Sequence, residues 1–269
     1  MIVYPNSKIN IGLFITRKRE DNFHDIESCF YPIEWKEALE ITLSDKVGFS
    51  SSGIDIPGNP DNNLCLKAYE LLAQNYDIPE VHIHLEKMVP IGAGLGGGSA
   101  DAAYTLKALN ELFKLEIENS ALKKFASEIG SDCPFFIDNQ PAIASGTGTT
   151  LDTFELSLSG KWIMLINPGL HIGTAEAYSN VSPKNIDFNL KEILLSTPIE
   201  QWKDIIQNDF EASVFPKYPE LQKLKSLLYE KGAIYASMTG SGSTIYGIFN
   251  KKPQNIHLDK GNVWTGMLK

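Results

Sequence analysis

The 269-residue chain has few cysteines, no long apolar run and no excess of positive charge. Its three cysteines, Cys29, Cys65 and Cys133, are too few and too scattered for a disulfide framework or a zinc knuckle. No apolar run approaches the roughly 20 residues that cross a bilayer. The first residues also lack the basic stretch and apolar core of a signal peptide. We therefore expect a reduced, cytoplasmic protein with no membrane partner.

The charge balance is acidic, with 24 Lys and Arg against 33 Asp and Glu, a formal net charge of −9. Nucleic-acid-binding proteins usually carry a basic excess or a basic stripe, so a nucleic-acid partner is not expected. A net negative field does not attract anions. An anionic ligand must therefore be held by local backbone amides, a metal ion and a few lysines.

The periodicity of apolar residues predicts an α+β protein. Hydrophobic residues make up 43% and charged residues 21%, which is ordinary for a globular protein. Alternation over 81–86 predicts a half-buried strand whose His82 and His84 face away from the core. Further strands are expected at 8–15, 30–43, 142–157, 162–166 and 244–249. Helices are expected at 62–76, from after Asp101 to Phe113, at 221–231 and from a capping Ser120. The apolar run at 162–166 predicts a buried strand that begins a new series of helices and strands. We therefore place a domain boundary just before it and predict two domains, 1–158 and 159–269.

A glycine-rich loop stands between the strand at 81–86 and the next helix. It comprises Pro90, Ile91, Gly92, Ala93, Gly94, Leu95, Gly96, Gly97, Gly98, Ser99 and Ala100. Glycine permits positive φ and close approach of a ligand to the backbone, and we expect positive φ at Gly97 in particular. Free N–H groups at a helix start favour phosphate. The loop therefore predicts an anion site, where Ser99 contacts a phosphate or a metal ion.

The residues of this loop fit two other known glycine-rich motifs less well. A Walker A loop requires Lys and Ser/Thr after its second conserved glycine, and here Gly97 is followed by Gly98 and Ser99. The dinucleotide pattern G-x-G-x-x-G is matched, but Pro90 opens the loop and the preceding strand alternates. A turn used only for packing remains a third interpretation, against which the backbone entropy of so many glycines argues.

Four segments resemble motifs of the GHMP kinases (galactokinase, homoserine kinase, mevalonate kinase and phosphomevalonate kinase). The loop at 90–100 is similar to their second motif, and its triple glycine resembles one branch of the family. Residues 8–11, Lys-Ile-Asn-Ile, are similar to the first motif of that branch, with Ser7 in place of the usual alanine. Residues 130–136 and 238–243 resemble two further motifs, so the similarity runs from residue 4 to about 249.

The resemblance implies a fold and a reaction. The fold would pair a ribosomal-S5-like N-terminal domain with a ferredoxin-like C-terminal domain. The loop would bind ATP with Mg²⁺, through metal ligands that stay unknown, in a monomer or homodimer. Asp132 would be the catalytic base and Lys8 would hold it ionised. Taken alone, the sequence favours Asp132 as an ordinary helix-terminus or turn aspartate and Lys8 as a solvated strand-edge lysine.

The resemblance also implies the substrate, a cytidyl diphosphate sugar alcohol phosphorylated on a hydroxyl group. The turn at 21–24, Asp-Asn-Phe-His, resembles the segment that grips cytosine in this branch. Phe23 and Tyr178 would stack on the base, His24 would bond its edge, and Asn10 would contact the substrate beside Lys8.

Three alternatives stay open at this point. Asn63 either lies near the adenine or caps a helix. The chain could instead be another GHMP small-molecule kinase, such as a homoserine or mevalonate kinase, or a catalytically silent nucleotide-binding relative. The pair Phe23-His24 and the triple glycine weigh against the former, and the presence of both Lys8 and Asp132 against the latter.

Overall fold

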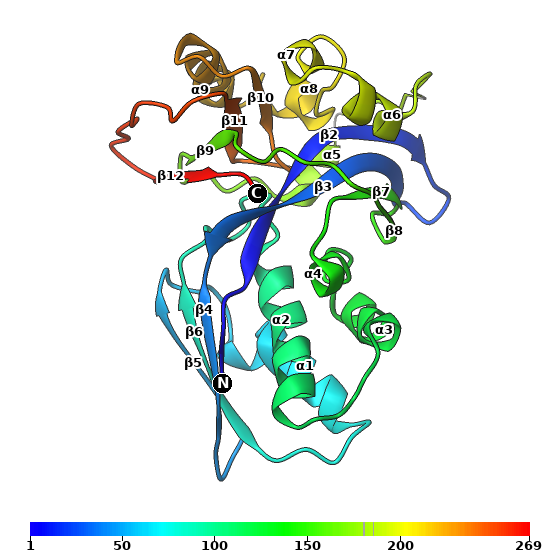
Figure 1. The fold of residues 1–269 in the computed structure, drawn as a ribbon, viewed down its shortest axis with the longest axis vertical. Helices are drawn as coiled ribbons and strands as arrows, with labels where there is room; N and C mark the ends of the chain where they lie inside the picture. Colours follow the sequence, from blue (N-terminus) through cyan, green and yellow to red (C-terminus); the bar gives the residue numbers. More distant parts are fainter. Residues whose placement is uncertain (180, 185) are drawn as a thin grey trace. The chain divides into compact units, whose positions relative to one another are not determined.

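The computed structural model describes residues 1–179, 181–184 and 186–269, whose contacts form two compact units (Figure 1). Unit 1 comprises Met1–Ser7, Trp35–Ile91 and Gly96–Gln140, and unit 2 comprises Lys8–Glu34, Gly92–Leu95 and Pro141–Lys269. The segments alternate between the units, so these units do not coincide with the domains predicted at 1–158 and 159–269. Residues 141–158 belong to unit 2 because their hairpin pairs with a strand of that unit. The division at residue 158 stays a prediction.

Unit 1 is a four-stranded sheet with helices packed on one face (Figure 1). The strand order is β1-β4-β6-β5, from β1 (Ile2–Val3), β4 (Ala38–Leu43), β6 (Val81–Lys87) and β5 (Gly48–Gly53). β5 pairs in parallel with β6, and the other pairs are antiparallel. Its helices are η1 (Pro60–Asn62), α1 (Leu64–Ala73), α2 (Gly97–Leu112), α3 (Asn119–Ile129) and α4 (Phe135–Asp138).

Unit 2 holds two further sheets. One has the order β10-β11-β9-β12, all antiparallel, from β10 (Tyr235–Met238), β11 (Ile245–Phe249), β9 (Trp162–Asn167) and β12 (Asn262–Met267). The other has the order β2-β3-β7-β8, from β2 (Asn6–Lys18), β3 (His24–Lys36), β7 (Ala142–Gly146) and β8 (Thr150–Thr153). β2 begins in unit 1 and β3 ends there.

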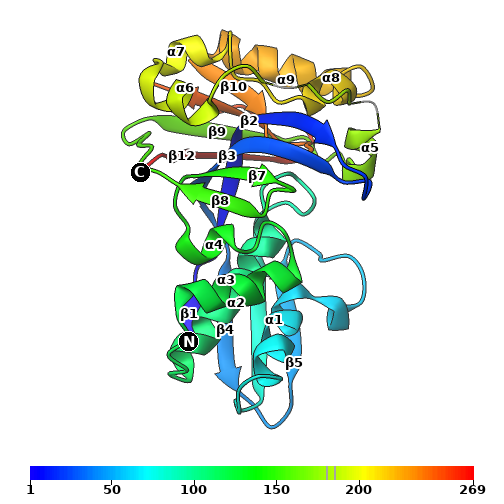
Figure 2. The ribbon, with the colours of Figure 1, turned by 90° about the vertical axis from the view of Figure 1, so that its right-hand side faces the viewer.

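Unit 2 has five helices in its described residues, α5 (Thr174–Tyr178), α6 (Leu190–Ser196), α7 (Ile199–Trp202), α8 (Phe210–Val214) and α9 (Pro219–Glu230). Of these, α9 packs on β10 and β11, and α7 packs on β10 (Figure 2). The buried face of α9 presents Leu221 and Leu228 to a core shared with Met164 and Ile166 of β9 and Ile245 of β11. Full burial of each such side chain stabilises the fold by about 1.5–3 kcal/mol. The expected α+β class is confirmed.

Local expectations can be compared with the structure at three places. β6 buries Val81 and the residues of its parity, while His82 and His84 lie on the opposite face, both hydrogen-bonded to Ser50 Oγ at 2.8 Å, as expected. Asn63 caps α1, since its Oδ1 accepts from the Cys65 N–H at 2.8 Å. The capping role expected of Ser120 is wrong: α3 begins one residue earlier, and the extended Glu118 precedes it.

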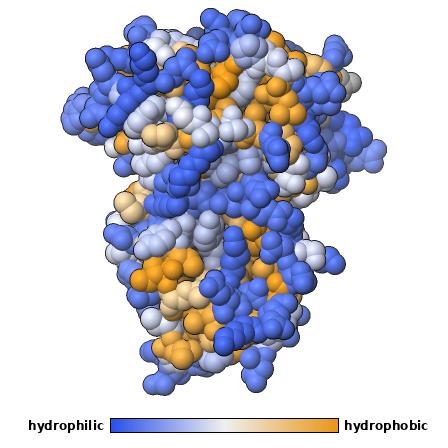
Figure 3. Space-filling model, in the orientation of Figure 1, coloured by the Kyte–Doolittle hydropathy of each residue, from blue (hydrophilic) through white to orange (hydrophobic). Residues whose placement is uncertain are grey.

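The surface is mainly hydrophilic in the face shown in Figure 3, with apolar side chains gathered in separate patches. None of the helices in the described part of the chain combines the length and hydropathy needed to cross a membrane.

Candidate functional site

The glycine-rich loop contains three glycines in the left-handed backbone region. Gly92, Gly94 and Gly96 have φ of +64°, +77° and +69°. Gly97, where positive φ was expected, is instead the first residue of α2, so that expectation is wrong. No side chain of the described residues caps this helix start. Its first N–H groups therefore point outward without a capping partner, as an oxyanion requires.

Gly94 packs against a second glycine-containing loop, Thr239–Ser243, within unit 2. The Thr239 hydroxyl donates to the Gly94 carbonyl at 2.9 Å. A Cβ on Gly94 would lie 2.0 Å from the Thr239 carbonyl oxygen, and a Cβ on Gly240 would lie 2.9 Å from Gly94 Cα. Only glycine permits this approach at both positions, so the two loops hold each other in one arrangement.

Lys8 is fixed in place by its neighbours in unit 2. The residue is 3% exposed, its Nζ donates to Asn10 Oδ1 at 2.6 Å, and it lies 4.4 Å from the centroid of the Phe30 ring. Asn10 Nδ2 donates to Ser28 Oγ at 2.8 Å, and the Asn10 N–H donates to the Thr239 hydroxyl at 3.0 Å. The amide of Asn10 thus orients Lys8, and its predicted contact with substrate stays a prediction.

Asp132 lies half-buried in the turn between α3 and α4, beside the buried Cys133. Burial raises the pKa of the Cys133 thiol to about 11, a hydrogen bond with Ser99 opposes that rise, and the charge of Asp132 adds to it. Ser99, at the start of α2, and Asp132 are therefore both close to this neutral thiol. Unit 1 thus brings the predicted base to the helix start of the glycine-rich loop. Lys8 belongs to unit 2, so its pairing with Asp132 stays a prediction.

A buried charged triad, which the sequence analysis missed, lies beneath the start of α2. Lys87 Nζ donates to Glu37 Oε1 at 2.6 Å and to Asp101 Oδ2 at 2.7 Å. A Cβ on Gly97 would lie 3.0 Å from Glu37 Oε1 and 3.2 Å from Lys87 Nζ. One sequence signal was available: Lys87 continues the buried parity of Val81 along β6.

The triad carries one cation and two carboxyl groups, so full ionisation would leave a buried net negative charge. Burial and the charge of Asp101 raise the pKa of Glu37 to about 7, and burial also raises the pKa of Asp101. Asp101 Oδ1 is buried without a hydrogen-bond partner among the described residues. Burial and the neighbouring negative charge therefore favour the protonated form of Glu37 up to about neutral pH.

The triad predicts a pH-dependent difference between the wild type and Glu37→Gln. Because the folded pKa of Glu37 is raised, its contribution to the free energy of unfolding is complete below the unfolded pKa of about 4.3 and is lost as pH rises through about 7. From pH 5 to pH 8 the wild type should lose about 1–3 kcal/mol relative to Glu37→Gln. Denaturant unfolding at each pH measures this difference. The exposed Glu40→Gln is the control, and parallel pH curves for wild type and Glu37→Gln would contradict the prediction.

The structure brings two of the predicted base-binding residues together in unit 2. The His24 and Tyr178 rings stack with centroids 4.6 Å apart and an 18° angle between planes, and Tyr178 meets Phe210 edge-on at 4.7 Å. Burial and the charge of Lys18 lower the pKa of His24, which favours a neutral ring at neutral pH. Phe23 is 64% exposed, at the tip of the turn.

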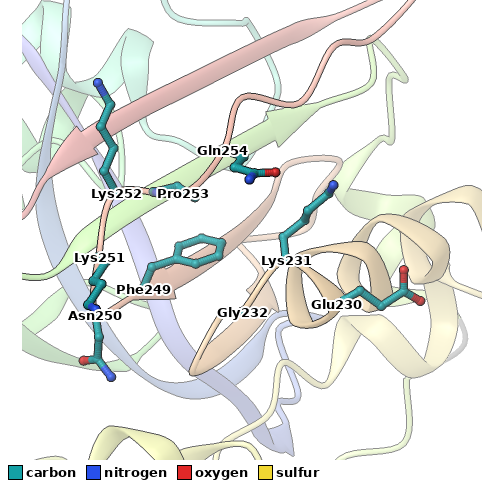
Figure 4. Close-up of a pocket in the computed structure, with 9 residues that line it drawn as sticks. All are labelled: Glu230, Lys231, Gly232, Phe249, Asn250, Lys251, Lys252, Pro253 and Gln254. Carbon is teal, nitrogen blue, oxygen red and sulfur yellow. The ribbon is translucent and has the colours of Figure 1, made fainter.

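A separate pocket of about 530 Å³ lies where α9 and β11 end (Figure 4). Its lining comprises Glu230, Lys231, Gly232, Phe249, Asn250, Lys251, Lys252, Pro253 and Gln254. Lys161 Nζ donates to Asn250 Oδ1 at 2.6 Å, and Lys252 Nζ lies 5.4 Å from the centroid of the Trp162 ring. The pocket contains none of the predicted site residues. Its Asn250 and Lys252 side chains already have partners within the protein.

Comparison with known proteins extends the motif resemblance to most of the chain. The family model described as the GHMP kinases N terminal domain matches residues 63–147, and the one described as GHMP kinases C terminal matches residues 190–258. A 4-diphosphocytidyl-2-C-methyl-D-erythritol kinase of Cytophaga hutchinsonii is 49% identical over 98% of this chain and 97% of its own length. A kinase of the same name from Bacteroides fragilis is 46% identical over 96% of both chains.

Solved structures agree with these matches. The crystal structure of a 4-(cytidine 5'-diphospho)-2C-methyl-D-erythritol kinase superposes with a TM-score of 0.83 at 28% identity, covering 100% of this chain and 99% of that chain. A homoserine kinase from Cytophaga hutchinsonii superposes with a TM-score of 0.69 at 17% identity, which shows a shared fold alone. The fold expected from the four motifs is thereby confirmed, and the chain belongs to the GHMP kinases.

Proposed function

We propose that this chain is an ATP-dependent kinase that phosphorylates the 2-hydroxyl group of 4-diphosphocytidyl-2-C-methyl-D-erythritol, a step of isoprenoid precursor synthesis. The observation that carries the proposal is the 49% identity over 98% of the chain with a kinase of that name. The geometry supports it, because a fixed lysine, a carboxylate beside a glycine-rich helix start and an aromatic-histidine turn are all present. Cytoplasmic location and a monomeric or homodimeric state stay predictions.

The phosphates of ATP would be held by the backbone of the glycine-rich loop. Positive φ at Gly92, Gly94 and Gly96 is the backbone conformation from which anion-binding turns are built, and the start of α2, which no side chain caps, would add further N–H donors. The helix dipole favours negative charge at this end. Donors fixed before the reaction need no reorganisation when charge develops on the transferred phosphoryl group, which is the main protein contribution to phosphoryl transfer.

Asp132 would accept the proton of the attacking hydroxyl group as the new phosphorus–oxygen bond forms. Its neighbour Cys133, with a pKa raised by burial, stays a neutral thiol and adds no competing negative charge. Lys8 would orient Asp132 and offset charge near the transferred group. Asn10 would hold the Lys8 amine in position for both tasks.

The donor set fits Mg²⁺. The Ser99 hydroxyl and the Asp132 carboxylate lie beside the same thiol, and both are oxygen ligands of the kind that Mg²⁺ prefers. No cluster of three or more His, Cys, Asp or Glu side chains suited to a metal occurs in the described segments. This composition agrees with an ion held largely by phosphate and water. When bound with ATP, Mg²⁺ would neutralise part of the phosphate charge.

A substrate panel tests the proposal directly. ATP consumption is measured with the cytidyl substrate, and beside it with homoserine, mevalonate and galactose. We expect turnover with the cytidyl substrate and none with the other three. Turnover with homoserine or mevalonate instead would make the chain another GHMP small-molecule kinase, and ATP binding without turnover on any acceptor would make it a silent relative.

Recognition of cytosine predicts different effects of substitutions at Phe23 and His24. Stacking contributes roughly 1–3 kcal/mol per base and hardly distinguishes bases, so Phe23→Ala should weaken cytidine and uridine analogues alike. Edge hydrogen bonds carry discrimination, so His24→Ala should narrow the preference for cytidine over uridine. Inhibition by cytidine and uridine diphosphate analogues measures both effects.

The control for this experiment is His82→Ala, which removes a histidine bonded to Ser50 on the outer face of the unit 1 sheet. It should leave both affinities unchanged, and ATP binding should be unaffected in all three variants. Equal binding of the cytidine and uridine analogues by the wild type would contradict the cytidyl assignment.

A further inference from the structure

A short segment of unit 2, Asn208–Glu211, forms hydrogen bonds with Met238 and Gly240, at the start of the loop that contacts Gly94. This segment leads into α8 and is itself tied to β2. The Leu13 N–H donates to the Gln207 carbonyl at 2.9 Å, and the Asp209 N–H donates to the Leu13 carbonyl at 2.8 Å. Asp209 Oδ2 also accepts from the Ile15 N–H at 2.8 Å. The segment is therefore anchored to the strand that carries Lys8 and Asn10.

The side-chain amide of Asn208 donates two hydrogen bonds to backbone carbonyls of this region. Its Nδ2 donates to the Met238 carbonyl at 2.8 Å and to the Gly240 carbonyl at 2.9 Å, and its Oδ1 accepts from the Phe210 N–H at 3.0 Å. The residue is 2% exposed. The two carbonyls belong to the residues before and after Thr239, so one buried amide fixes the peptide units Met238–Thr239 and Gly240–Ser241.

The Glu211 carboxylate accepts hydrogen bonds from the residues that precede Thr239. Its Oε1 accepts from the Met238 N–H at 2.8 Å and from Ser237 Oγ at 3.1 Å, while Oε2 accepts from Lys225 Nζ at 2.5 Å. Met238 is therefore bound at its N–H by Glu211 and at its carbonyl by Asn208. These bonds leave the backbone at Thr239 little freedom to turn.

The position of Thr239 decides two contacts of the candidate site. Its hydroxyl donates to the Gly94 carbonyl and accepts from the Asn10 N–H, so it joins the glycine-rich loop to the residue that orients Lys8. We propose that Asn208 and Glu211 are positioning residues for phosphoryl transfer, which act by fixing Met238–Gly240 and through it Gly94 and Asn10. The inference rests on the proposed kinase function.

Asn208→Ala is the first test. Misplacement of reacting groups by about 1 Å costs about 10²-fold in rate, so kcat should fall by about tenfold to hundredfold while KM for the cytidyl substrate stays unchanged. Exchange of the Thr239 and Gly242 amide hydrogens should become faster, because both belong to the loop. Asn208→Ser keeps one hydroxyl donor and should lie between wild type and Asn208→Ala. It also serves as the test if Asn208→Ala does not fold.

Two controls separate positioning from loss of stability. Asn75→Ala removes an exposed amide-to-carbonyl bond in unit 1, to Leu71 at 2.8 Å, and should keep wild-type kcat. Leu194→Ala removes a buried side chain of α6 and leaves a cavity in the core beneath it. This variant should lower Tm at least as much as Asn208→Ala does, while kcat per folded molecule stays unchanged. Wild-type kcat in folded Asn208→Ala, or an equal loss of kcat in Leu194→Ala, would overturn the inference.

The outcome is separable from that of the proposed function. Wild-type turnover on the cytidyl substrate tests the function, and the ratio of variant to wild type tests the positioning. Should the wild type turn over no acceptor, ATP affinity by calorimetry and amide exchange on the same proteins decide the inference. Weaker ATP binding with faster exchange in Asn208→Ala would then support it, and unchanged values would overturn it.

Discussion

Asp132→Asn is expected to lower kcat for the cytidyl substrate by about 10²–10⁴-fold, the usual contribution of a general base. Asparagine keeps the shape and most hydrogen bonds of aspartate but cannot accept the proton of the hydroxyl group. Because binding of ATP and of the acceptor does not require that proton transfer, their KM values should change little. Steady-state kinetics with both substrates varied measures the separation of kcat from KM.

Asp138→Asn is the matched control for this variant. Asp138 belongs to the neighbouring α4 and forms an ion pair with Lys123 at the surface, so its loss should leave kcat near the wild-type value. Lys8→Ala should also fall mainly in kcat, since the amine offsets charge in the reaction rather than in binding alone. Near wild-type kcat in Asp132→Asn would remove Asp132 from the mechanism.

Gly94→Ala is expected to lower kcat/KM by about 10²-fold or more, because it must displace the glycine-rich loop. The new Cβ would lie 2.0 Å from the Thr239 carbonyl oxygen, at a φ of +77° that is unfavourable for alanine. Relief of that overlap moves Gly94 and its N–H group by an amount comparable to the displacement of about 1 Å that costs this much in rate. ATP affinity by calorimetry should weaken in parallel.

Gly160→Ala separates the two causes. Gly160 also has positive φ, +81°, but a Cβ there meets nothing within 4 Å. It should show only the modest loss of stability that positive φ imposes on alanine, about 1–2 kcal/mol, with unchanged ATP affinity. If Gly94→Ala behaved like Gly160→Ala, the close packing of the two loops would not matter for ATP binding.

The sequence by itself determined the local features on which the site is built. Repeated glycines between a strand and a helix indicated positive φ and an uncapped helix start, because glycine adopts positive φ without the steric cost that a Cβ brings, and Gly92, Gly94 and Gly96 have positive φ. Alternation along β6 indicated which side chains are buried, and Lys87 followed the same parity. A helix cap was one of the two roles considered for Asn63, and Asn63 does cap α1. Ser120 was expected to cap the next helix but lies inside α3, which the extended Glu118 precedes without a side-chain cap.

The tertiary structure alone decided which distant groups meet. β5, a Gly-Phe-Ser-Ser-Ser-Gly segment with little apolar pattern, becomes a strand because β6 offers a free edge for parallel pairing. Lys87 and Glu37 are 50 residues apart, and Thr239 and Gly94 are 145 apart. A polar residue reveals in sequence what it can donate or accept, but not its partner. Its partner depends on how apolar faces pack, and packing brings Asn208 to Met238 and Asp132 to the start of α2.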